Sequence, residues 1–344
     1  MDFVCEIAKS SFSDCRLCKF NLSFTKANKN ILPKLAWFLF FAETDSFGIR
    51  HLNYMKAAIN SQRLYANSIS PFVVSLNKIK NEEFTNWLDR HNIPLYYHKL
   101  SFYDKLPKRM RLKRSSNLNV GAFGRIDIGL VVDKLRIDLI KRGLDPERIL
   151  YTDTDVLFAR DIDYNYLKSL HLSTFAAGTE LFSPSLNTGV MFINTTTFLY
   201  HHKSLVSFGI QKNFRFVSYD QTWIQQYFSK YKWIRLKDEE YNARAFLHPI
   251  KNQVAPRIWH FHGYKPQDVE CWYDKIKNGK WPLRAWKDTI KECTKFSKPK
   301  CKFLPILNSG CRHFGVISNI IRKNPCYLRT YLFLWEQYLK MLQE

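Results

Sequence analysis

The sequence has no apolar run that approaches the roughly 20 residues of a membrane-spanning helix. Its most apolar stretch, LAWFLFFA at residues 35–42, is far too short and is typical of a buried strand. The N-terminus, MDFVCEIAKSSFSDC, has no basic start followed by an apolar stretch, so no signal peptide is visible. We therefore expect a soluble, non-secreted chain, cytoplasmic or of a compartment that the sequence does not reveal.

Cysteine is absent from the middle of the chain. The eight cysteines all lie before Lys19 or after Glu270. Cys15 and Cys18 form a CxxC pair, but no second CxxC completes a zinc site. Without a secretory signal we expect free thiols, and a disulfide or zinc link between the termini is the alternative.

Acidic residues are too few to balance the basic ones. The chain has 53 Lys plus Arg against 30 Asp plus Glu, a formal net charge of +23. This excess favours nucleic acid, an acidic membrane surface or a phosphorylated substrate as partner. The basic run at residues 105–114 lacks interleaved aromatics, and no zinc-finger, RRM or helix-turn-helix signature is evident, so no specific nucleic acid is expected. Peripheral contact with an anionic membrane and a plain solvated face are both open.

What the sequence does contain is a long alternation of strand and helix patterns. Hydrophobic residues make up 46% of the chain, enough for a sizeable core. Residues 1–33 are expected to form an irregular leader. Residues 34–268 alternate short strands with amphipathic helices, which predicts an α/β fold with a largely parallel sheet. Residues 269–344 lose the strand signals and end in an amphipathic helix, which predicts a mainly helical extension.

The strand-like segment ILYTDTDVLF, residues 149–158, carries Asp153 and Asp155 in its middle. Aspartate is depleted in strands, and an unpartnered buried carboxylate is costly. In open α/β sheets, ligands bind outside the carboxyl ends of the strands. Two carboxylates one residue apart can reach one divalent cation if the backbone turns there, and oxygen ligands suit Mn²⁺ or Mg²⁺. The pair predicts a metal site, with a solvated turn or a helix cap as the alternative.

Two further apolar segments carry polar residues at one end. RIWHFHGYKP offers His260 and His262, followed by Gly263 and Lys265. Histidine is a competent Mn²⁺ ligand, glycine allows close backbone approach, and lysine can neutralise a phosphate. LNTGVMFIN, residues 186–194, opens with a polar Asn-Thr-Gly. The alternatives are a satisfied core histidine in the first segment and a plain turn in the second.

The set RIDI, LYTDTDVLF, LNTGVMFIN, YDQ and IWHFHGYKP, in this order within residues 35–268, resembles the DxD-containing GT-A glycosyltransferases that use nucleotide sugars. It looks like family 8, the glycogenin and galactosyltransferase-like group, in a branch with HFHGxKP found in algae and large viruses. The resemblance implies a Rossmann-like α/β fold with a mixed central sheet. It also implies bound Mn²⁺ (or Mg²⁺), a nucleotide-sugar donor that is expected to be UDP-linked, and a carbohydrate or glycoprotein acceptor. The activity would be hexosyl or pentosyl transfer.

The resemblance assigns the metal and the diphosphate to one group of residues. Asp153 and Asp155 match the DxD motif, and His260 matches the third metal ligand. Gly263 and Lys265 match the glycine and lysine that hold the diphosphate. The family places two residues between that glycine and lysine, whereas this chain has one.

The donor and acceptor sites are assigned in the same way. Arg125 and Asp127 match a helix over the nucleotide and donor sugar, and Asn187 and Gly189 match the segment near the donor sugar and acceptor. The loop after the first strand matches the family's base and ribose contacts, here Ala42, Glu43 and Thr44.

The stereochemical outcome is left open by the sequence. Asp220 and Gln221 match the DQ pair beside the reacting carbon. A retaining enzyme could use the leaving phosphate as base, with Gln221 on the opposite face. An inverting enzyme needs a carboxylate base, for which Glu180 and Asp220 are the candidates.

The main competing interpretation is a basic nucleic-acid-binding protein, motivated by the net charge of +23, and three further function classes also compete. A metal-dependent phosphoryl-transfer enzyme, such as a nuclease, would need further acids in register, and none is convincing. A dinucleotide-binding dehydrogenase is disfavoured because the first strand leads into AETDSFG and not into GxGxxG. A non-catalytic scaffold is disfavoured because the DxD pair, His260 and Lys265 are all intact.

Overall fold

The structure is a computed structural model that describes residues 24–26, 34–43, 48–107, 121–171, 173–180, 185–216, 219–244, 255–261 and 325–344. The chain divides into two compact units, one made of Phe24–Ala243 with Pro256–His260 and the other of Met1–Ser23, Arg244–Ala255 and Phe261–Glu344. None of the helices within these described ranges combines the length and the apolar character needed to cross a bilayer.

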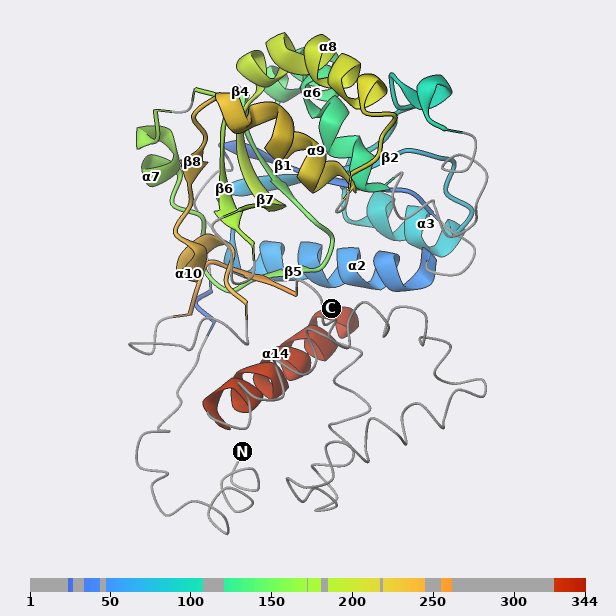
Figure 1. Cartoon of the computed structure of the whole chain (residues 1–344). Helices are drawn as coiled ribbons and strands as arrows, with labels where there is room; N and C mark the ends of the chain where they lie inside the picture. Colours follow the sequence, from blue (N-terminus) through green and yellow to red (C-terminus); the bar gives the residue numbers. More distant parts are fainter. Residues whose placement is uncertain are drawn as a thin grey trace, which may run out of the picture. The chain divides into compact units, whose positions relative to one another are not determined.

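The larger unit is built on a seven-stranded sheet with the order β3-β2-β1-β4-β7-β6-β8 (Figure 1). The strands are β1 (Leu35–Phe41), β2 (Ile69–Ser75), β3 (Leu95–Tyr97), β4 (Asp145–Thr152), β6 (Phe175–Thr179), β7 (Leu186–Asn194) and β8 (Ile234–Arg235). Strands β1 to β4 are mutually parallel, and β7 runs antiparallel to both of its neighbours, β4 and β6. The predicted α/β fold with a mixed central sheet is therefore confirmed.

Helices cover both faces of this sheet and give three layers (Figure 1). Trp37 and Leu39 of β1 belong to one hydrophobic cluster, which includes side chains of α2 (Gly48–Tyr65) and α3 (Glu82–Arg90). Phe38 and Phe40 belong to the other, with α6 (Ile128–Lys141), α8 (Thr195–Gln211) and α9 (Tyr219–Tyr227). Because β1 is covered on both faces, it is apolar at every position, as expected for a central parallel strand.

Short elements complete the description. In the larger unit they are η2 (Tyr103–Lys105), η4 (Gly124–Asp127), α7 (Tyr164–Ser169), η5 (Phe228–Lys230) and α10 (Asp238–Tyr241). In the smaller unit the described helix is α14 (Pro325–Gln343), where the sequence predicts an amphipathic helix. The rest of the predicted helical extension lies outside the described residues.

The predicted strand around the DxD motif is two strands and not one. Strand β4 ends at Thr152, the chain turns through residues 153–155, and β5 (Val156–Phe158) leaves the main sheet. Strand β5 pairs antiparallel with β9 (Ile258–His260) in a separate two-stranded sheet. The physical reason is that the carboxylates occupy the turn, so neither has to sit within a ladder of buried apolar side chains.

Candidate metal centre and donor site

The DxD motif lies where the strand order of the sheet reverses. From β1 the chain moves outward to β2 and β3 and then returns to β4 on the other side of β1. Leu39 pairs with Thr152, so the carboxyl ends of β1 and β4 are adjacent. Crevices at such switch points are where open α/β sheets bind ligands.

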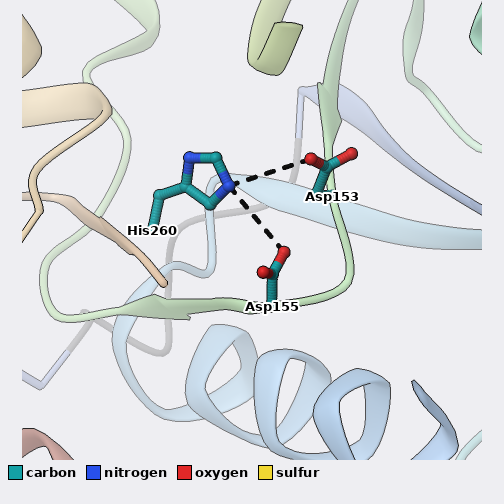
Figure 2. A group of neighbouring side chains, drawn as sticks. All are labelled: Asp153, Asp155 and His260. Atoms are coloured by element: carbon teal, nitrogen blue, oxygen red, sulfur yellow. Dashed lines mark ion pairs between the residues drawn. The ribbon is translucent and has the colours of Figure 1, made fainter. Parts of the chain in front are cut away.

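Strand pairing brings His260 to the DxD motif from far away in the sequence. In the β5–β9 ladder, His260 is the partner of Val156, the residue directly after Asp155. Its Nε2 lies 3.8 Å from Oδ2 of Asp153 and 3.8 Å from Oδ1 of Asp155 (Figure 2). Asp155 and His260 are buried, and Asp153 is partly exposed.

These three side chains fit a divalent cation. They offer one ligand atom each within 4.8 Å of one another, and they are the one such group of three or more found among the described residues. Two atoms that bind one ion at about 2.1 Å can be at most about 4.2 Å apart, and both 3.8 Å separations from His260 satisfy this limit. Two carboxylates and an imidazole form a donor set suited to Mn²⁺.

Gly189 makes room for the imidazole. A Cβ atom at this position would lie 2.0 Å from Cε1 and 2.6 Å from Nε2 of His260, so the ring rests directly on the backbone of β7. The backbone carbonyl of Gly189 also accepts a hydrogen bond of 2.8 Å from the amide of Asp153. Gly189 was predicted to lie near the donor sugar and acceptor, and the structure places it against His260 of the candidate metal group.

Arg125 holds the side of Asp153 that faces away from His260. Its Nη2 donates to Oδ1 of Asp153 at 2.6 Å, and Tyr151 donates to the same oxygen at 2.9 Å. Its Nε lies 2.9 Å from Oδ2 of Asp220 at the start of α9. The guanidinium also stacks over the ring of Tyr151. Oδ2 of Asp153 is thereby left on the side of His260.

One guanidinium serves two carboxylates in this group through two ion pairs. Burial opposes the charge of Arg125, but the carboxylates of Asp153 and Asp220 outweigh it and raise the pKa of the guanidinium. Burial raises the pKa of Asp220 to about 6, against the effect of the Arg125 charge. Arg125 is thus a permanent cation between the DxD motif and the DQ pair.

Polar side chains of β7, of α9 and of the residue after β6 converge beside the candidate metal group. Gln221 of α9 donates from Nε2 to Oε2 of Glu180 at 2.6 Å. Asn187 of β7 donates from Nδ2 toward Gln221 Oε1 at 3.3 Å and Glu180 Oε2 at 3.4 Å. The predicted residues of the reacting centre therefore lie together, although their roles stay predictions.

Asp127, predicted to lie near the nucleotide and donor sugar, makes several hydrogen bonds within the protein. It is fully buried, and its carboxylate accepts hydrogen bonds from Ser101, His98 and His202. Burial alone would raise its pKa, but the hydrogen bonds from His202, His98 and Ser101 outweigh it and hold the pKa well below the ordinary value. This arrangement ties α8 and the segment after β3 to η4, and the donor-site role of Asp127 stays a prediction.

The predicted base and ribose loop is described in part. Ala42 is buried, and the backbone of Glu43 exchanges two hydrogen bonds with Asn77, at 2.8 and 2.7 Å. The Glu43 carboxylate accepts a hydrogen bond from the amide of Lys80. An open pocket of about 480 Å³, lined by residues 75–78 and 97–99, lies at the carboxyl ends of β2 and β3 beside this loop. Thr44, His262, Gly263 and Lys265 lie outside the described residues.

Sequence reasoning missed two residues of this centre, Asn242 and Asp238. Asn242 is completely buried and accepts a hydrogen bond of 2.8 Å from Nδ1 of His260. Asp238, at the start of α10, accepts from the backbone and side chain of Thr179 at 2.8 and 2.6 Å. The segment KDEEYNAR that contains both has no recognisable motif, so no signal in the sequence points to them.

Comparisons with known proteins find similar solved structures. No protein-family model matches the chain, and no curated protein matches it. The structure of the glycosyltransferase GlyE from Streptococcus pneumoniae TIGR4 is 17% identical with a TM-score of 0.47, over 77% of this chain and 64% of that one. The galactosyltransferase LgtC in complex with donor and acceptor sugar analogs is 15% identical with a TM-score of 0.48, over 74% of this chain and 100% of that one.

A third similar structure is mouse xyloside xylosyltransferase 1, 13% identical with a TM-score of 0.45, over 67% of this chain and 98% of that one. The chain covers 64% of the GlyE structure, which is less than two thirds of its length. Because all three TM-scores are below 0.5, no activity is inferred from these proteins for this chain.

Proposed function

We propose that this chain is a metal-dependent glycosyltransferase that moves a sugar from a nucleotide-sugar donor, expected to be UDP-linked, to a hydroxyl of a carbohydrate or glycoprotein. The observation that carries this proposal is the convergence of Asp153, Asp155 and His260 at the switch point of the sheet. A ligand group with one imidazole and two carboxylates suits a cation that also binds phosphate oxygens. The motif set RIDI, DxD, NTG, DQ and HFHG supports a sugar nucleotide over other phosphate esters.

Asp153, Asp155 and His260 would hold Mn²⁺ or Mg²⁺ in this proposal. The bound cation would stabilise negative charge on the oxygens of the nucleoside diphosphate as it leaves. Arg125 keeps Asp153 oriented through Oδ1, so that Oδ2 is presented toward His260. Lys265 and Gly263, by their position after His260 in the sequence, are proposed to meet the diphosphate.

The proposed transfer breaks the bond between the anomeric carbon and the diphosphate oxygen and forms one to the acceptor oxygen. The acceptor proton must pass to a base. Glu180 is the better of the two candidate carboxylates, because Asp220 is buried and paired with Arg125 while Glu180 is only partly buried. Gln221, which donates to Glu180, would hold that carboxylate in place. A retaining course with Gln221 on the face opposite the leaving group remains the alternative.

Donor recognition is proposed for the pocket beside β2 and β3. Its walls include an exposed tyrosine, Tyr97, and two lysines, Lys78 and Lys99. An aromatic face can stack on a base, and an ammonium group can approach a phosphate. The pocket adjoins the loop of Glu43 through Asn77, so base and ribose could be bound there with the diphosphate toward the DxD motif.

Calorimetry with Mn²⁺ and UDP tests the metal assignment. Asp155→Ala and His260→Ala should each weaken Mn²⁺-dependent UDP binding at least tenfold, because each removes a ligand. Asp133→Ala is the matched control, since its carboxylate is exposed on α6 and its ion pair is with Arg136, outside the proposed donor pocket. A panel of sugar nucleotides with Mn²⁺, scored for nucleotide release, then identifies the donor. Unchanged affinity in both ligand variants would exclude this metal site.

A further inference from the structure

A chain of hydrogen bonds runs in one direction from the imidazole of His260 to the carboxylate of Glu180. His260 Nδ1 is 2.8 Å from Oδ1 of Asn242, and the Nδ2 of Asn242 donates to Oδ1 of Asn187 at 3.4 Å. Asn187 Nδ2 donates to Oε1 of Gln221 at 3.3 Å, and Gln221 Nε2 donates to Oε2 of Glu180 at 2.6 Å. Each side-chain amide in this series accepts one hydrogen bond on the side of His260 and donates one on the side of Glu180.

The two ends of the chain determine its direction. An ionised carboxylate can only accept hydrogen bonds, so Glu180 requires the amide nitrogen of Gln221 to face it. Asp238 imposes the same condition on Asn242, because Nδ2 of Asn242 lies 3.4 Å from Oδ1 of Asp238. The amide oxygen of Asn242 must therefore face His260. Because an amide oxygen is only an acceptor, Nδ1 of His260 has to carry the proton.

Packing prevents these groups from turning. A Cβ atom at Gly178 would lie 2.1 Å from Nδ2 of Asn242, and one at Gly189 would lie 2.0 Å from Cε1 of His260. Asn242 is fully buried, and Asp238 is itself held by Thr179 and by Arg235 at 3.1 Å. The orientation of the Asn242 amide is thus set by a carboxylate on one side and by the sheet backbone on the other.

From this geometry we infer that Asn242 is a positioning residue that sets the tautomer of His260, so that the lone pair of Nε2 points at Asp153 and Asp155. The inference rests on the proposed metal site, because its benefit is a histidine that is ready to bind a cation. Partners of metal-binding histidines commonly act in this way, and their loss typically lowers metal affinity about 10–100-fold. Asn242 would act through His260 and would not touch the metal or the donor.

Nitrogen-15 NMR of the metal-free protein provides the direct test. The His260 signals, assigned by their loss in His260→Ala, should show the Nδ1–H tautomer at pH 8. Asn242→Leu has nearly the same shape and no acceptor, so it should shift His260 toward the Nε2–H form and lower Mn²⁺ affinity about 10–100-fold. Asn194→Leu is the control, because Asn194 caps α8 at the other end of β7.

Either of two results would overturn the inference. One is an Nε2–H or mixed tautomer in the unaltered protein, which decides the matter even if Asn242→Leu fails to fold. The other is an unchanged tautomer and Mn²⁺ affinity in a folded Asn242→Leu variant. If Mn²⁺ does not bind the unaltered protein at all, the proposed function fails, while the tautomer measurement still stands because it uses no metal, donor or acceptor.

Discussion

Gly189 and His260 are in contact so closely that no side chain fits between them. A Cβ atom added to Gly189 would meet Cε1 of the imidazole at 2.0 Å, well inside the 3.0 Å that real Cβ atoms keep. The ring cannot move toward Asn242, because its Nδ1 is already hydrogen-bonded there at 2.8 Å. The position of the His260 ring, the third candidate metal ligand, therefore depends on the absence of a side chain at Gly189.

Replacing Gly189 by alanine should displace His260 and weaken Mn²⁺ binding at least tenfold. The added methyl group overlaps with the ring, and the ring can only leave by breaking its contact with Asn242 or with the DxD pair. Isothermal titration with Mn²⁺ measures the effect. Gly209→Ala is the matched control, because its Cβ would meet the Trp223 ring at 2.2 Å in the core. Both variants should lose stability, and equal Mn²⁺ affinities in the two would contradict the prediction.

Arg125 should be needed for folding as well as for the site. Arg125→Met leaves the buried Asp220 and the partly buried Asp153 without their shared cation, which should cost about 3–5 kcal/mol of unfolding free energy. Arg125→Lys should be less stable than the unaltered protein and more stable than Arg125→Met, because an ammonium group keeps the charge but cannot reproduce the two-pronged hydrogen bonding of the guanidinium. Urea unfolding at pH 7 measures these changes. Arg142→Met removes a more exposed pair with Asp138 and should cost about 1 kcal/mol or less, so a similar loss in both Met variants would argue against this account.

Stability should fall in acid through the buried carboxylate of Asp127. Because its pKa is held below the ordinary value by His202, His98 and Ser101, its ionised form stabilises the fold fully above about pH 4. That contribution is lost as the pH falls toward the lowered pKa. Asp127→Asn leaves buried donors without a carboxylate and should cost about 1–3 kcal/mol at pH 5. The difference in unfolding free energy from the unaltered protein should shrink between pH 5 and pH 3.

The control for this pH dependence is Asp104→Asn, whose carboxylate is exposed beside Lys99. Its stability should follow that of the unaltered protein throughout the same range. If the difference in unfolding free energy between Asp127→Asn and the unaltered protein stayed constant down to pH 3, the effect would be one of shape and not of charge.

The sequence predicted the strands of the sheet better than their arrangement. The apolar run of β1 and the alternation around it are local patterns, and they were sufficient to predict the α/β class. The insertion of β7 between β4 and β6 depends on pairing between distant segments, so no local pattern reveals it. Helix α8, 17 residues long, was not predicted, because it begins with three threonines, which are poor helix formers. It is stabilised by the Asn194 cap and by packing of Phe198 and Leu205 in the core.

The candidate site was predictable only where its residues form a motif. Asp153, Asp155 and His260 lie at the ends of apolar segments, and the structure brings them together. Asn242 and Asp238 carry no such mark, because their roles come from contacts with residues far away in the chain, such as Asn187 and Thr179. Arg125 was predicted to lie near the donor. Its ion pairs with Asp153 and Asp220 were not predicted, because nothing in the sequence links Arg125 to Asp220.

Lys265 should act on the departing diphosphate more than on the acceptor. We expect a lysine two residues after a glycine, and close in sequence to His260, to meet phosphate oxygens. Lys265→Ala should therefore lower donor hydrolysis and sugar transfer together, by about 2–4 kcal/mol of transition-state stabilisation. Nucleotide release measured with and without acceptor separates the two reactions, and Lys141→Ala on the exposed face of α6 is the control. If Lys265→Ala left donor hydrolysis intact and abolished only transfer, the side chain would belong to the acceptor site. The single residue between Gly263 and Lys265, where the family that the motifs resemble has two, would then be the reason for the changed role.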